Sequence, residues 1–316
     1  SDRVMFNRQL CQLLEVPPRL PEEPLTQEHK NLAASLQKLY ELEFLKLVNT
    51  AKNITGSENL CIGGGCAYNG VANSKAYKIF KSVHVPFAPS DAGSAIGACL
   101  DEHVNISPYL GPDFSNKHIK NQLHKHLDKL VFFKLTEEKL VTKVASLLEA
   151  QNIVAWFQGR MEFGARALGN RSILASAKNP KMREKLNYVI KKREGFRPFA
   201  PSILEEQKEW FGVKETSPYM NLVSYAKKLG FAIPFPAATH IDGTSRVQTV
   251  NKEQNPRFYK LLNEVRRRQG VGTLLNTSYN LKDQTVTMTP KQAIERYLSS
   301  DIDFLVINNF LIKKIQ

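Results

Sequence analysis

Short apolar runs that end in glycine or proline and alternate with helix-like segments are the feature of this sequence that most restricts its fold. Residues 59–65 (NLCIGGG) are typical of a short strand that ends in three glycines. A helix pattern over 67–80 follows, then a second strand over 81–89 with a proline stop, and a second helix over 93–103. This alternation predicts an α/β fold.

The second half of the chain shows the same mixture. Residues 152–159 (NIVAWFQG) predict a strand that runs directly into a loop rich in glycine and arginine. Asn179 and Pro180 predict a helix start, with a cap followed by proline at the first helical position. Further strands are expected at 172–176, 245–250, 270–280 and 303–314, and further helices near 256–268 and 290–299.

The domain organisation follows from where these patterns weaken. An apolar period predicts a helix of about 20 residues carried by Leu32 to Val48. Residues 113–140 are polar and lysine-rich, and we expect a linker there. Two domains are therefore predicted, over 1–112 and 141–316, which is an ordinary division for 316 residues.

The net charge of +14 calls for an anionic partner, and its distribution is more informative than its total. Residues 156–200 hold 11 lysines and arginines against 3 glutamates, so +8 of the +14 lies in one stretch of 45 residues. A basic nucleic-acid-binding protein is disfavoured, because the chain has neither a helix-turn-helix nor aromatic stacking platforms within the basic stretch.

The remaining composition excludes other classes. Four cysteines form no CxxC pair, and buried thiols are expected rather than disulfides or zinc. His124 and His126 point apart on a helix and are expected to be surface residues. No apolar run of 18 residues and no signal sequence are seen, which predicts a cytoplasmic protein without a membrane span.

The loop GRMEFGARALGNRS (Gly159 to Ser172) carries three arginines among three glycines. Glycines leave backbone N–H groups accessible, and guanidinium forks match phosphate oxygens. The pattern predicts a phosphate cradle. A surface loop with solvated or salt-bridged arginines is the alternative on composition alone.

A longer pattern adds a family resemblance. GRMEFGARALGNRSILA with NPKMREKLNYVIKKREGFRPFAPSIL resembles the signature of the carbamoyltransferases that include nodulation protein U and the antibiotic O-carbamoyltransferases. HIDGTSRVQTV and LLNTSYN are similar to two further segments of that family. CIGGGCAYNGVAN and PSDAGSAIGAC resemble the glycine-rich and DxGxAxGA motifs of its actin-like domain.

The resemblance implies a fold and a reaction. The fold is the second lobe of an actin-like (ASKHA) domain over 1–112, followed by a YrdC-like α/β domain with a twisted mixed sheet over 141–316. Carbamoyl phosphate and ATP, with Mg²⁺, would form carbamoyl adenylate in the YrdC-like domain. The actin-like domain would pass the carbamoyl group to a hydroxyl of a sugar-like small molecule, and the resemblance also implies a homodimer.

The resemblance also implies site residues. Contacts to phosphate or carbamoyl oxygens, with two polar neighbours, are expected from Arg160, Arg166, Arg171, Lys185, Arg193, Arg246, Asn276 and Ser278. Nucleotide contacts are expected from Gly63, Gly64, Gly65 and Asn69. Asp91 is expected to bind Fe²⁺ or a similar divalent metal, with a helix N-cap as the competing interpretation.

Other residues near these motifs keep two interpretations. Arg197 and Phe199 belong to the site or only fix the extended segment around them. Lys191 and Lys192 are expected to be solvated. His240 and Asp242 are an acid and base pair, or Asp242 stabilises the turn before Gly243.

The sequence departs from the family pattern in two places. It has no HxxxH, which supplies the family's histidine metal ligands, so we expect a C-terminal part of a longer enzyme that cannot complete acceptor transfer. Residues 280–288 (NLKDQTVTM) replace a segment closer to NxxGEPIV, which puts the substrate contacts of that loop in doubt. A threonylcarbamoyl-type tRNA-modifying enzyme and a non-catalytic regulatory homologue are the alternative functions.

Overall fold

The computed structural model describes residues 6–20, 22–101, 104–225 and 235–315. The chain divides into two compact units, Ser1–Ser57 and Glu58–Gln316.

The four cysteines are not buried, contrary to expectation: Cys61, Cys66 and Cys99 are exposed and Cys11 is partly exposed. Short elements explain this, since strand β1 (Asn59–Cys61) and helix α4 (Asp91–Gly97) have no buried residue of their own.

The first unit consists of two helices, α1 (Arg8–Leu14) and α2 (Gln27–Thr55). The helix predicted around Leu32 to Val48 is confirmed, but α2 is longer, with 29 residues. Its N-terminus is fixed by a capping box, in which Thr26 and His29 each accept the backbone N–H of the other. Gly56, with φ of 65°, ends the helix in the left-handed conformation.

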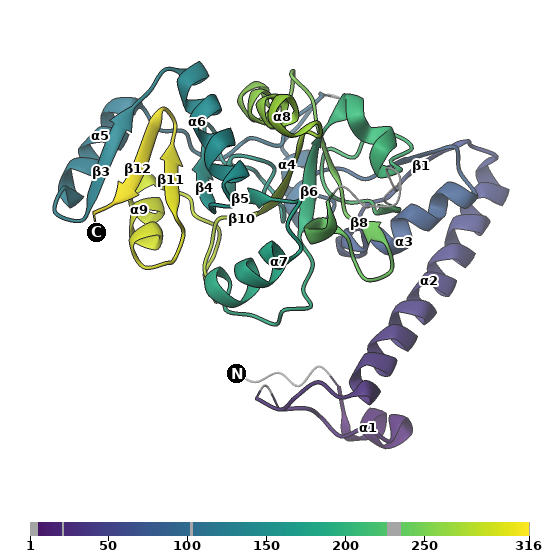
Figure 1. The fold of residues 1–316 in the computed structure, drawn as a ribbon. Helices are drawn as coiled ribbons and strands as arrows, with labels where there is room; N and C mark the ends of the chain where they lie inside the picture. Colours follow the sequence, from purple (N-terminus) through teal and green to yellow (C-terminus); the bar gives the residue numbers. More distant parts are fainter. Residues whose placement is uncertain (1–5, 21, 102–103, 226–234, 316) are drawn as a thin grey trace. The chain divides into compact units, whose positions relative to one another are not determined.

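An eight-stranded sheet forms the centre of the second unit, in the order β3-β12-β11-β4-β5-β10-β6-β9 (Figure 1). The pairs β4 with β11 and β6 with β9 are parallel, and the other neighbouring pairs are antiparallel. The expected α/β fold with a mixed sheet is confirmed. The strands are β3 (Leu130–Lys134), β4 (Val154–Phe157), β5 (Arg171–Ser176), β6 (Ala200–Leu204), β9 (Gln248–Val250), β10 (Thr273–Ser278), β11 (Phe304–Ile307) and β12 (Phe310–Lys314).

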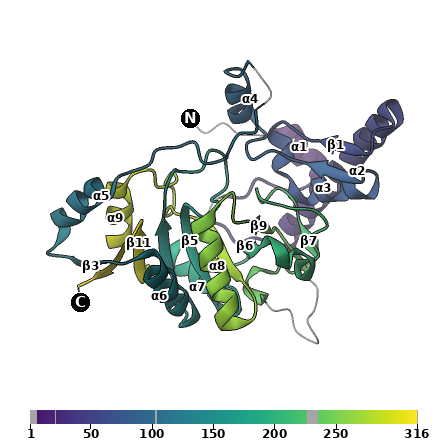
Figure 2. The same cartoon turned by 90° about the horizontal axis from the view of Figure 1, so that it is seen from above.

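Helices cover both faces of this sheet. On one face α6 (Glu137–Glu149) and α8 (Pro256–Gln269) lie side by side over Trp156 and Leu274 (Figure 2). On the other face α5 (Asn116–Leu123), α7 (Lys181–Lys185) and α9 (Pro290–Leu298) pack over Phe157 and Leu275. Because successive strand residues point to opposite faces, the central strands contribute apolar side chains to both cores.

The segment 113–140, expected to be a linker, is instead part of the sheet domain. It contains α5 and the edge strand β3, which pairs with β12. Sequence periodicity missed β3 because it lies at the sheet edge, where only Leu130 of its five residues is buried. His124 is exposed and His126 is partly exposed, as expected for surface histidines.

The predicted order of strand, glycine turn, helix, strand and helix holds for residues 58–97. Strand β1 pairs in parallel with β2 (Ser82–His84), and α3 (Gly70–Lys75) lies between them in the chain. This segment contacts the sheet domain directly, since Asn73 donates to the carbonyl of Asn221 at 3.0 Å. Over the part of the chain that the structure describes, no helix has the length and apolar character needed to cross a membrane.

Candidate functional site

A single buried carboxylate organises the arginine loop between β4 and β5. Oε1 of Glu162 accepts the backbone N–H groups of Leu168, Asn170 and Arg171 at 2.6, 2.8 and 3.2 Å. Glu162 is 6% exposed. The sequence analysis assigned Glu162 no role. Its place as the only acid in a loop with three arginines could have marked it as a residue that organises the loop.

Glycines let this loop pass close to its neighbours. Gly169 has φ of 102°, and a Cβ there would lie 2.3 Å from Cδ1 of Phe258 on α8. Gly164 has φ of 123°, and a Cβ there would lie 2.8 Å from the carbonyl oxygen of Phe87. The loop is therefore held between the sheet domain and the segment that precedes it.

Arg171 does not face a ligand. Its side chain is 0% exposed, and its guanidinium carbon lies 3.6 Å from the centre of the Phe157 ring. Its terminal nitrogens donate at 2.7 to 3.1 Å to the carbonyls of Pro112, Gln158, Gly159 and Asn170. The expectation that Arg171 contacts phosphate is wrong, because these donors already hold the loop and the start of β5 together.

Three other arginines converge on one small pocket, which we call the arginine pocket. Arg166 comes from the loop, Arg193 follows α7, and Arg246 lies between β8 (Thr244–Ser245) and β9. The pocket has a volume of about 150 Å³, and among the described residues its lining includes no carboxylate. The rest of its wall consists of Ala165, Ala167, Pro198, Phe199, Ala200, Met220, Asn276, Thr277 and Ser278.

The three guanidinium groups raise the electrostatic potential of the pocket. Burial and then the charges of Arg166 and Arg193 lower the pKa of Arg246 to about 10. Burial also lowers the pKa of Arg166, while burial and then Arg197 lower that of Arg193. Nε of Arg166 has no hydrogen-bond partner among the residues described. An anion in this pocket would relieve the repulsion between the three guanidinium groups.

Arg193 is placed by an irregular helix end. After α7 the chain makes a π-helical turn over Leu186–Ile190, a geometry that is frequent at functional sites. Within it, buried Asn187 accepts from Nε of Arg193 at 2.8 Å and donates to the carbonyls of Gly195 and Arg197. The guanidinium of Arg193 lies 5.0 Å from the Phe199 ring. Phe199 thus lines the arginine pocket and packs against Arg193, and Asn187 holds Arg193 in place, which the sequence did not reveal.

Asn276 and Ser278, predicted as polar neighbours of the phosphate contacts, line the arginine pocket from β10. Nδ2 of Asn276 donates to the carbonyl of Ala167, to Oγ of Ser202 and to Oε1 of Gln248. These acceptors fix the orientation of the amide. Oγ of Ser278 donates to Oδ1 of Asn280 at 2.6 Å.

Lys191 is buried, whereas a solvated lysine was expected. It is 5% exposed, and its Nζ donates to the carbonyls of Ser278 and Asn280 and to Oδ1 of Asn280 at 2.6, 2.9 and 2.9 Å. Burial, and then the charges of Arg193 and Arg296, lower the pKa of Lys191 to about 7. The sequence placed this lysine at the end of a predicted helix and gave no sign that its side chain is buried. Lys192 is exposed, as expected.

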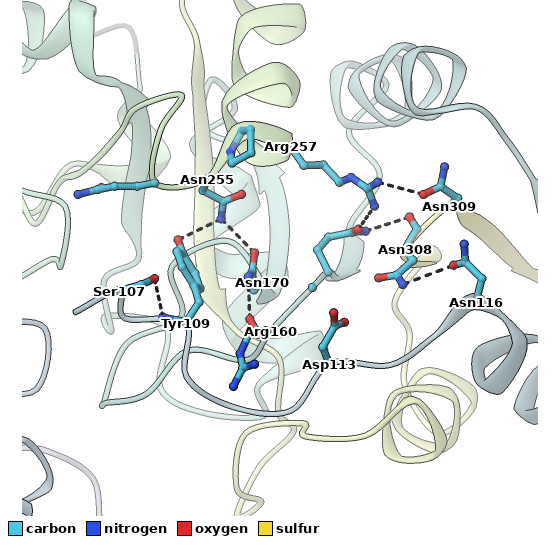
Figure 3. A pocket seen from close by; sticks show the side chains of 14 residues that line it. Ser107, Tyr109, Asp113, Asn116, Arg160, Asn170, Asn255, Arg257, Asn308 and Asn309 are labelled. Atoms are coloured by element: carbon cyan, nitrogen blue, oxygen red, sulfur yellow. Dashed lines mark hydrogen bonds between the residues drawn. The ribbon is translucent and has the colours of Figure 1, made fainter. Parts of the chain in front are cut away.

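Two predicted phosphate contacts lie away from the arginine pocket. Lys185 forms a partly exposed ion pair with Asp303, with Nζ 3.7 Å from Oδ2. Arg160 is exposed, donates to the carbonyl of Leu110 at 2.8 Å, and lines a different cavity of about 590 Å³ (Figure 3). Amide side chains dominate that cavity, including Asn255 at the N-terminus of α8 and Asn308 and Asn309 after β11.

The glycine-rich segment lies next to the arginine loop. The guanidinium of Arg166 is 5.4 Å from the centre of the Tyr68 ring. Gly63, Gly64 and Gly65 are exposed, and Gly64 has φ of 86° with no described atom within 4 Å of a Cβ placed there. Asn69 caps α3 by accepting the N–H of Ala72 at 3.1 Å, so its side-chain oxygen is already engaged.

Asp91 is exposed and is the first residue of α4, so Ser90 occupies the N-cap position instead. The Asp91 carboxylate in the first turn interacts favourably with the positive end of the helix dipole. Across the described residues, no group of three His, Cys, Asp or Glu side chains is placed to hold a metal ion. The residues present therefore do not fit a complete metal centre, and no chemical step is assigned to one.

Asp242 stabilises a turn. Its Oδ1 accepts the backbone N–H of Thr244 at 3.0 Å and the hydroxyl of Thr244 at 2.7 Å. Nδ1 of His240 lies 2.9 Å from the same hydroxyl. The turn interpretation of Asp242 accounts for these contacts.

The altered loop at 280–288 keeps the backbone that a glycine would favour. Asp283, at the position of the family's glycine, has φ of 57°, in the left-handed region that Asp tolerates better than most residues. Lys282 and Asp283 line a cavity beside the arginine pocket. The loop is therefore near the site, as expected.

Comparisons with known proteins agree with the resemblance seen in the motifs. The family model described as "Carbamoyltransferase C-terminus" matches residues 145–314, and "Carbamoyltransferase N-terminus" matches residues 2–100. The expectation of a C-terminal part alone is thus corrected, since both models match.

Individual relatives match over most of this chain. An uncharacterized protein of Synechocystis is 39% identical, over 98% of this chain and 56% of the relative. Nodulation protein NolNO of Sinorhizobium fredii is 36% identical, over 92% and 45%, and nodulation protein U of Rhizobium fredii is 36% identical, over 72% and 39%. The chain spans about half the length of the curated relatives it matches. With one family model covering more than half of its residues, the chain belongs to the carbamoyltransferase family.

Proposed function

We propose that the arginine pocket binds carbamoyl phosphate and takes part in forming carbamoyl adenylate from it and ATP. In the balanced reaction, water releases inorganic phosphate from carbamoyl phosphate and leaves carbamate. A carbamate oxygen then attacks the α-phosphorus of ATP, and the bond to the β-phosphate breaks to release pyrophosphate. The carbamoyl group of the adenylate is finally transferred to a hydroxyl of a sugar-like acceptor, and AMP leaves.

The observation that carries this proposal is the convergence of Arg166, Arg193 and Arg246 on a pocket of about 150 Å³ whose lining, among the described residues, includes no carboxylate. Each hydrogen bond between a guanidinium and a phosphate oxygen contributes roughly 1.5 to 3 kcal/mol. The small volume suits one phosphorylated one-carbon group better than a whole nucleotide. Membership of the carbamoyltransferase family supports carbamoyl phosphate as that group.

The side chains would act electrostatically. Arg166, Arg193 and Arg246 would neutralise the phosphate of the first substrate and stabilise the charge on the departing phosphate. Asn276, whose amide is oriented by three acceptors, would help to position the carbamoyl group. Mg²⁺ would accompany ATP as part of that substrate.

The glycine-rich segment is proposed to approach the adenylate. Gly64 is exposed, no described atom lies within 4 Å of a Cβ placed there, and Tyr68 from the same segment lies 5.4 Å from the Arg166 guanidinium. Transfer to the acceptor belongs to the whole protein, whose relatives are about twice as long as this chain. Fe²⁺ or a similar ion at Asp91 would need ligands from beyond the residues described.

Pyrophosphate release tests the proposal. The purified chain would be given ATP, Mg²⁺ and carbamoyl phosphate, with each omitted in turn, and Arg246→Ala would be compared with Arg160→Ala. We expect release that requires both substrates, is lost in Arg246→Ala and persists in Arg160→Ala. If the folded chain releases no pyrophosphate and carbamoyl phosphate does not raise its melting temperature, the proposal fails and a regulatory role takes its place.

A further inference from the structure

A buried glutamine lies next to the arginine pocket without forming part of its wall. Gln248 is the first residue of β9 and follows Arg246 by two residues in the HIDGTSRVQTV segment. Its side chain is 2% exposed, and the described lining of the pocket does not include it. Any effect of Gln248 on a ligand in the pocket must therefore pass through the residues that Gln248 contacts.

Both ends of the Gln248 amide are hydrogen-bonded. Its Nε2 donates to the carbonyl of Leu168 at 3.0 Å. Its Oε1 accepts from Oγ of Ser202 at 2.5 Å and from Nδ2 of Asn276 at 3.0 Å. If the amide turned over, its oxygen would face the Leu168 carbonyl and its NH2 group would face the NH2 group of Asn276. These contacts therefore allow only one orientation of the Gln248 amide.

The Leu168 carbonyl is a fixed point in the arginine loop. It also accepts from the hydroxyl of Tyr109 at 3.0 Å. The backbone N–H of the same residue donates to Oε1 of Glu162 at 2.6 Å, and both Leu168 and Glu162 are buried. Gln248 is thus anchored to a residue whose backbone is hydrogen-bonded at both its N–H and its carbonyl group.

The other end of Gln248 contacts Asn276, which does line the pocket. Asn276 lies on β10, and Ser202 lies on β6, the strand between β10 and β9 in the sheet. Nδ2 of Asn276 donates to Oγ of Ser202 at 3.0 Å, and the Ser202 hydroxyl in turn donates to Gln248. Side chains from three neighbouring strands therefore form one closed set of hydrogen bonds around the Asn276 amide.

Loss of the Gln248 amide would release the Asn276 side chain. Nδ2 of Asn276 would lose one of its two acceptors at 3.0 Å, and the carbonyl of Ala167 is a longer contact at 3.2 Å. The Ser202 hydroxyl would lose the oxygen to which it donates and would be free to donate to Asn276 instead. An amide that turns over exchanges its donor end for its acceptor end, which changes what it offers to an anionic ligand.

We propose that Gln248 is a positioning residue for the arginine pocket, which acts on the ligand through Asn276 without contacting the ligand itself. The identity of the ligand, carbamoyl phosphate, rests on the proposed function. The hold of Gln248 on Asn276 rests on the hydrogen bonds alone.

A double-mutant cycle separates this role from a merely structural one. Calorimetric titration of carbamoyl phosphate into the complete folded chain would compare wild type, Gln248→Met, Asn276→Ala and the double variant. Gln248→Met keeps the length of the side chain but removes its donor and its acceptor. We expect it to weaken binding about fivefold, as for the loss of one hydrogen bond, and by less than about twofold when residue 276 is already alanine.

Gln207→Met is the matched control. Gln207 is 5% exposed, and its Oε1 accepts the backbone N–H of Gly272 at 2.9 Å. Neither of these two residues lines the arginine pocket. The variant should lower the melting temperature and leave the affinity for carbamoyl phosphate unchanged. If both glutamine variants weaken binding equally, the loss reflects general destabilisation and the assignment of Gln248 is overturned.

The side-chain amide protons of Asn276 give a second readout that needs no ligand. They are buried and hydrogen-bonded in the wild type, so they should exchange slowly with water. Their NMR signal is identified by its loss in Asn276→Ala. Gln248→Met should make the exchange at least about fivefold faster, whereas Gln207→Met should not change it. An unchanged exchange rate in Gln248→Met would show that Gln248 does not hold Asn276.

The outcomes distinguish this inference from the proposed function. If Gln248→Met weakens binding equally with and without Asn276, the inference fails although carbamoyl phosphate binds. If the wild type does not bind carbamoyl phosphate, the proposed function fails, and the exchange rates alone decide whether Gln248 holds Asn276. The exchange rates also decide if Asn276→Ala binds too weakly for the titration.

Discussion

Oδ1 of Asn187 accepts a 2.8 Å hydrogen bond from Nε of Arg193, six residues further along the chain. The bond spans the π-helical turn, and Arg193 lines both the arginine pocket and the adjoining cavity at Lys282 and Asp283. The same amide donates to the carbonyls of Gly195 and Arg197. One buried side chain thus fixes both the turn and the arginine.

Asn187→Ala should disorder this arrangement. We expect carbamoyl phosphate to bind more weakly, with the unfolding free energy lowered by about 1 to 3 kcal/mol because two partly buried hydrogen bonds to carbonyls are lost. Arg193→Ala should weaken binding equally, with a smaller loss of stability. Binding that is unchanged in folded Asn187→Ala would show that Arg193 is positioned by other contacts.

Arg171→Met should act on stability rather than on ligand binding. The variant retains the length of the side chain but leaves the carbonyls around Arg171 without a donor. Urea denaturation should show a loss of about 3 kcal/mol or more, as for other broken buried charge networks. Exposed Arg160→Ala is the comparison and should cost less than about 1 kcal/mol. A stable Arg171→Met protein that fails to bind carbamoyl phosphate would show that Arg171 contacts the ligand after all.

Gly169→Ala should be strongly destabilising. Its Cβ would lie 2.3 Å from Cδ1 of Phe258 at a φ of 102°. We expect a lowered melting temperature and a loss of about 2 kcal/mol or more from overpacking and backbone strain. Gly97→Ala, where no described atom lies within 4 Å of the added methyl, should be nearly neutral. Equal melting temperatures for the two variants would contradict the close packing of the loop on α8.

Lys191 should make stability depend on pH. Its pKa falls from an ordinary value of 10.5 to about 7 in the folded chain. Between these values the unfolded chain binds more protons, so the free energy of unfolding should rise with pH from about 7 to about 10. Urea unfolding of the wild type and of Lys191→Met across this interval measures the difference. A difference that is flat or falls with pH would mean that the three acceptors of Lys191 keep its ammonium charged.

The sequence identified those residues of the candidate site that belong to a recognisable motif and also line the arginine pocket. The glycines and arginines of the loop marked the strand-to-strand connection, and HIDGTSRVQTV and LLNTSYN supplied Arg246, Asn276 and Ser278, which line the arginine pocket. The order of elements over 58–97 also followed from short apolar runs and turn residues.

The errors have a common physical origin. Arginine looks the same in a sequence whether its donors face a ligand or backbone carbonyls, so Arg171 could not be separated from Arg166. Lys185 and Arg160 have phosphate-binding chemistry, but the structure directs them to Asp303 and to another cavity. Lys191 and Asn187 act through a π-helical turn, which has no periodic signature.

Carbamoyl phosphate binding to two arginine variants tests the central claim most directly. Titration of the freshly dissolved compound into wild type, Arg246→Ala and Arg160→Ala compares the removal of one guanidinium inside the arginine pocket with one outside it. We predict at least about a tenfold loss of affinity in Arg246→Ala, corresponding to one charge-assisted hydrogen bond, and wild-type affinity in Arg160→Ala. Equal losses in both variants, or an unchanged affinity in a folded Arg246→Ala, would contradict the assignment of the arginine pocket as the carbamoyl phosphate site.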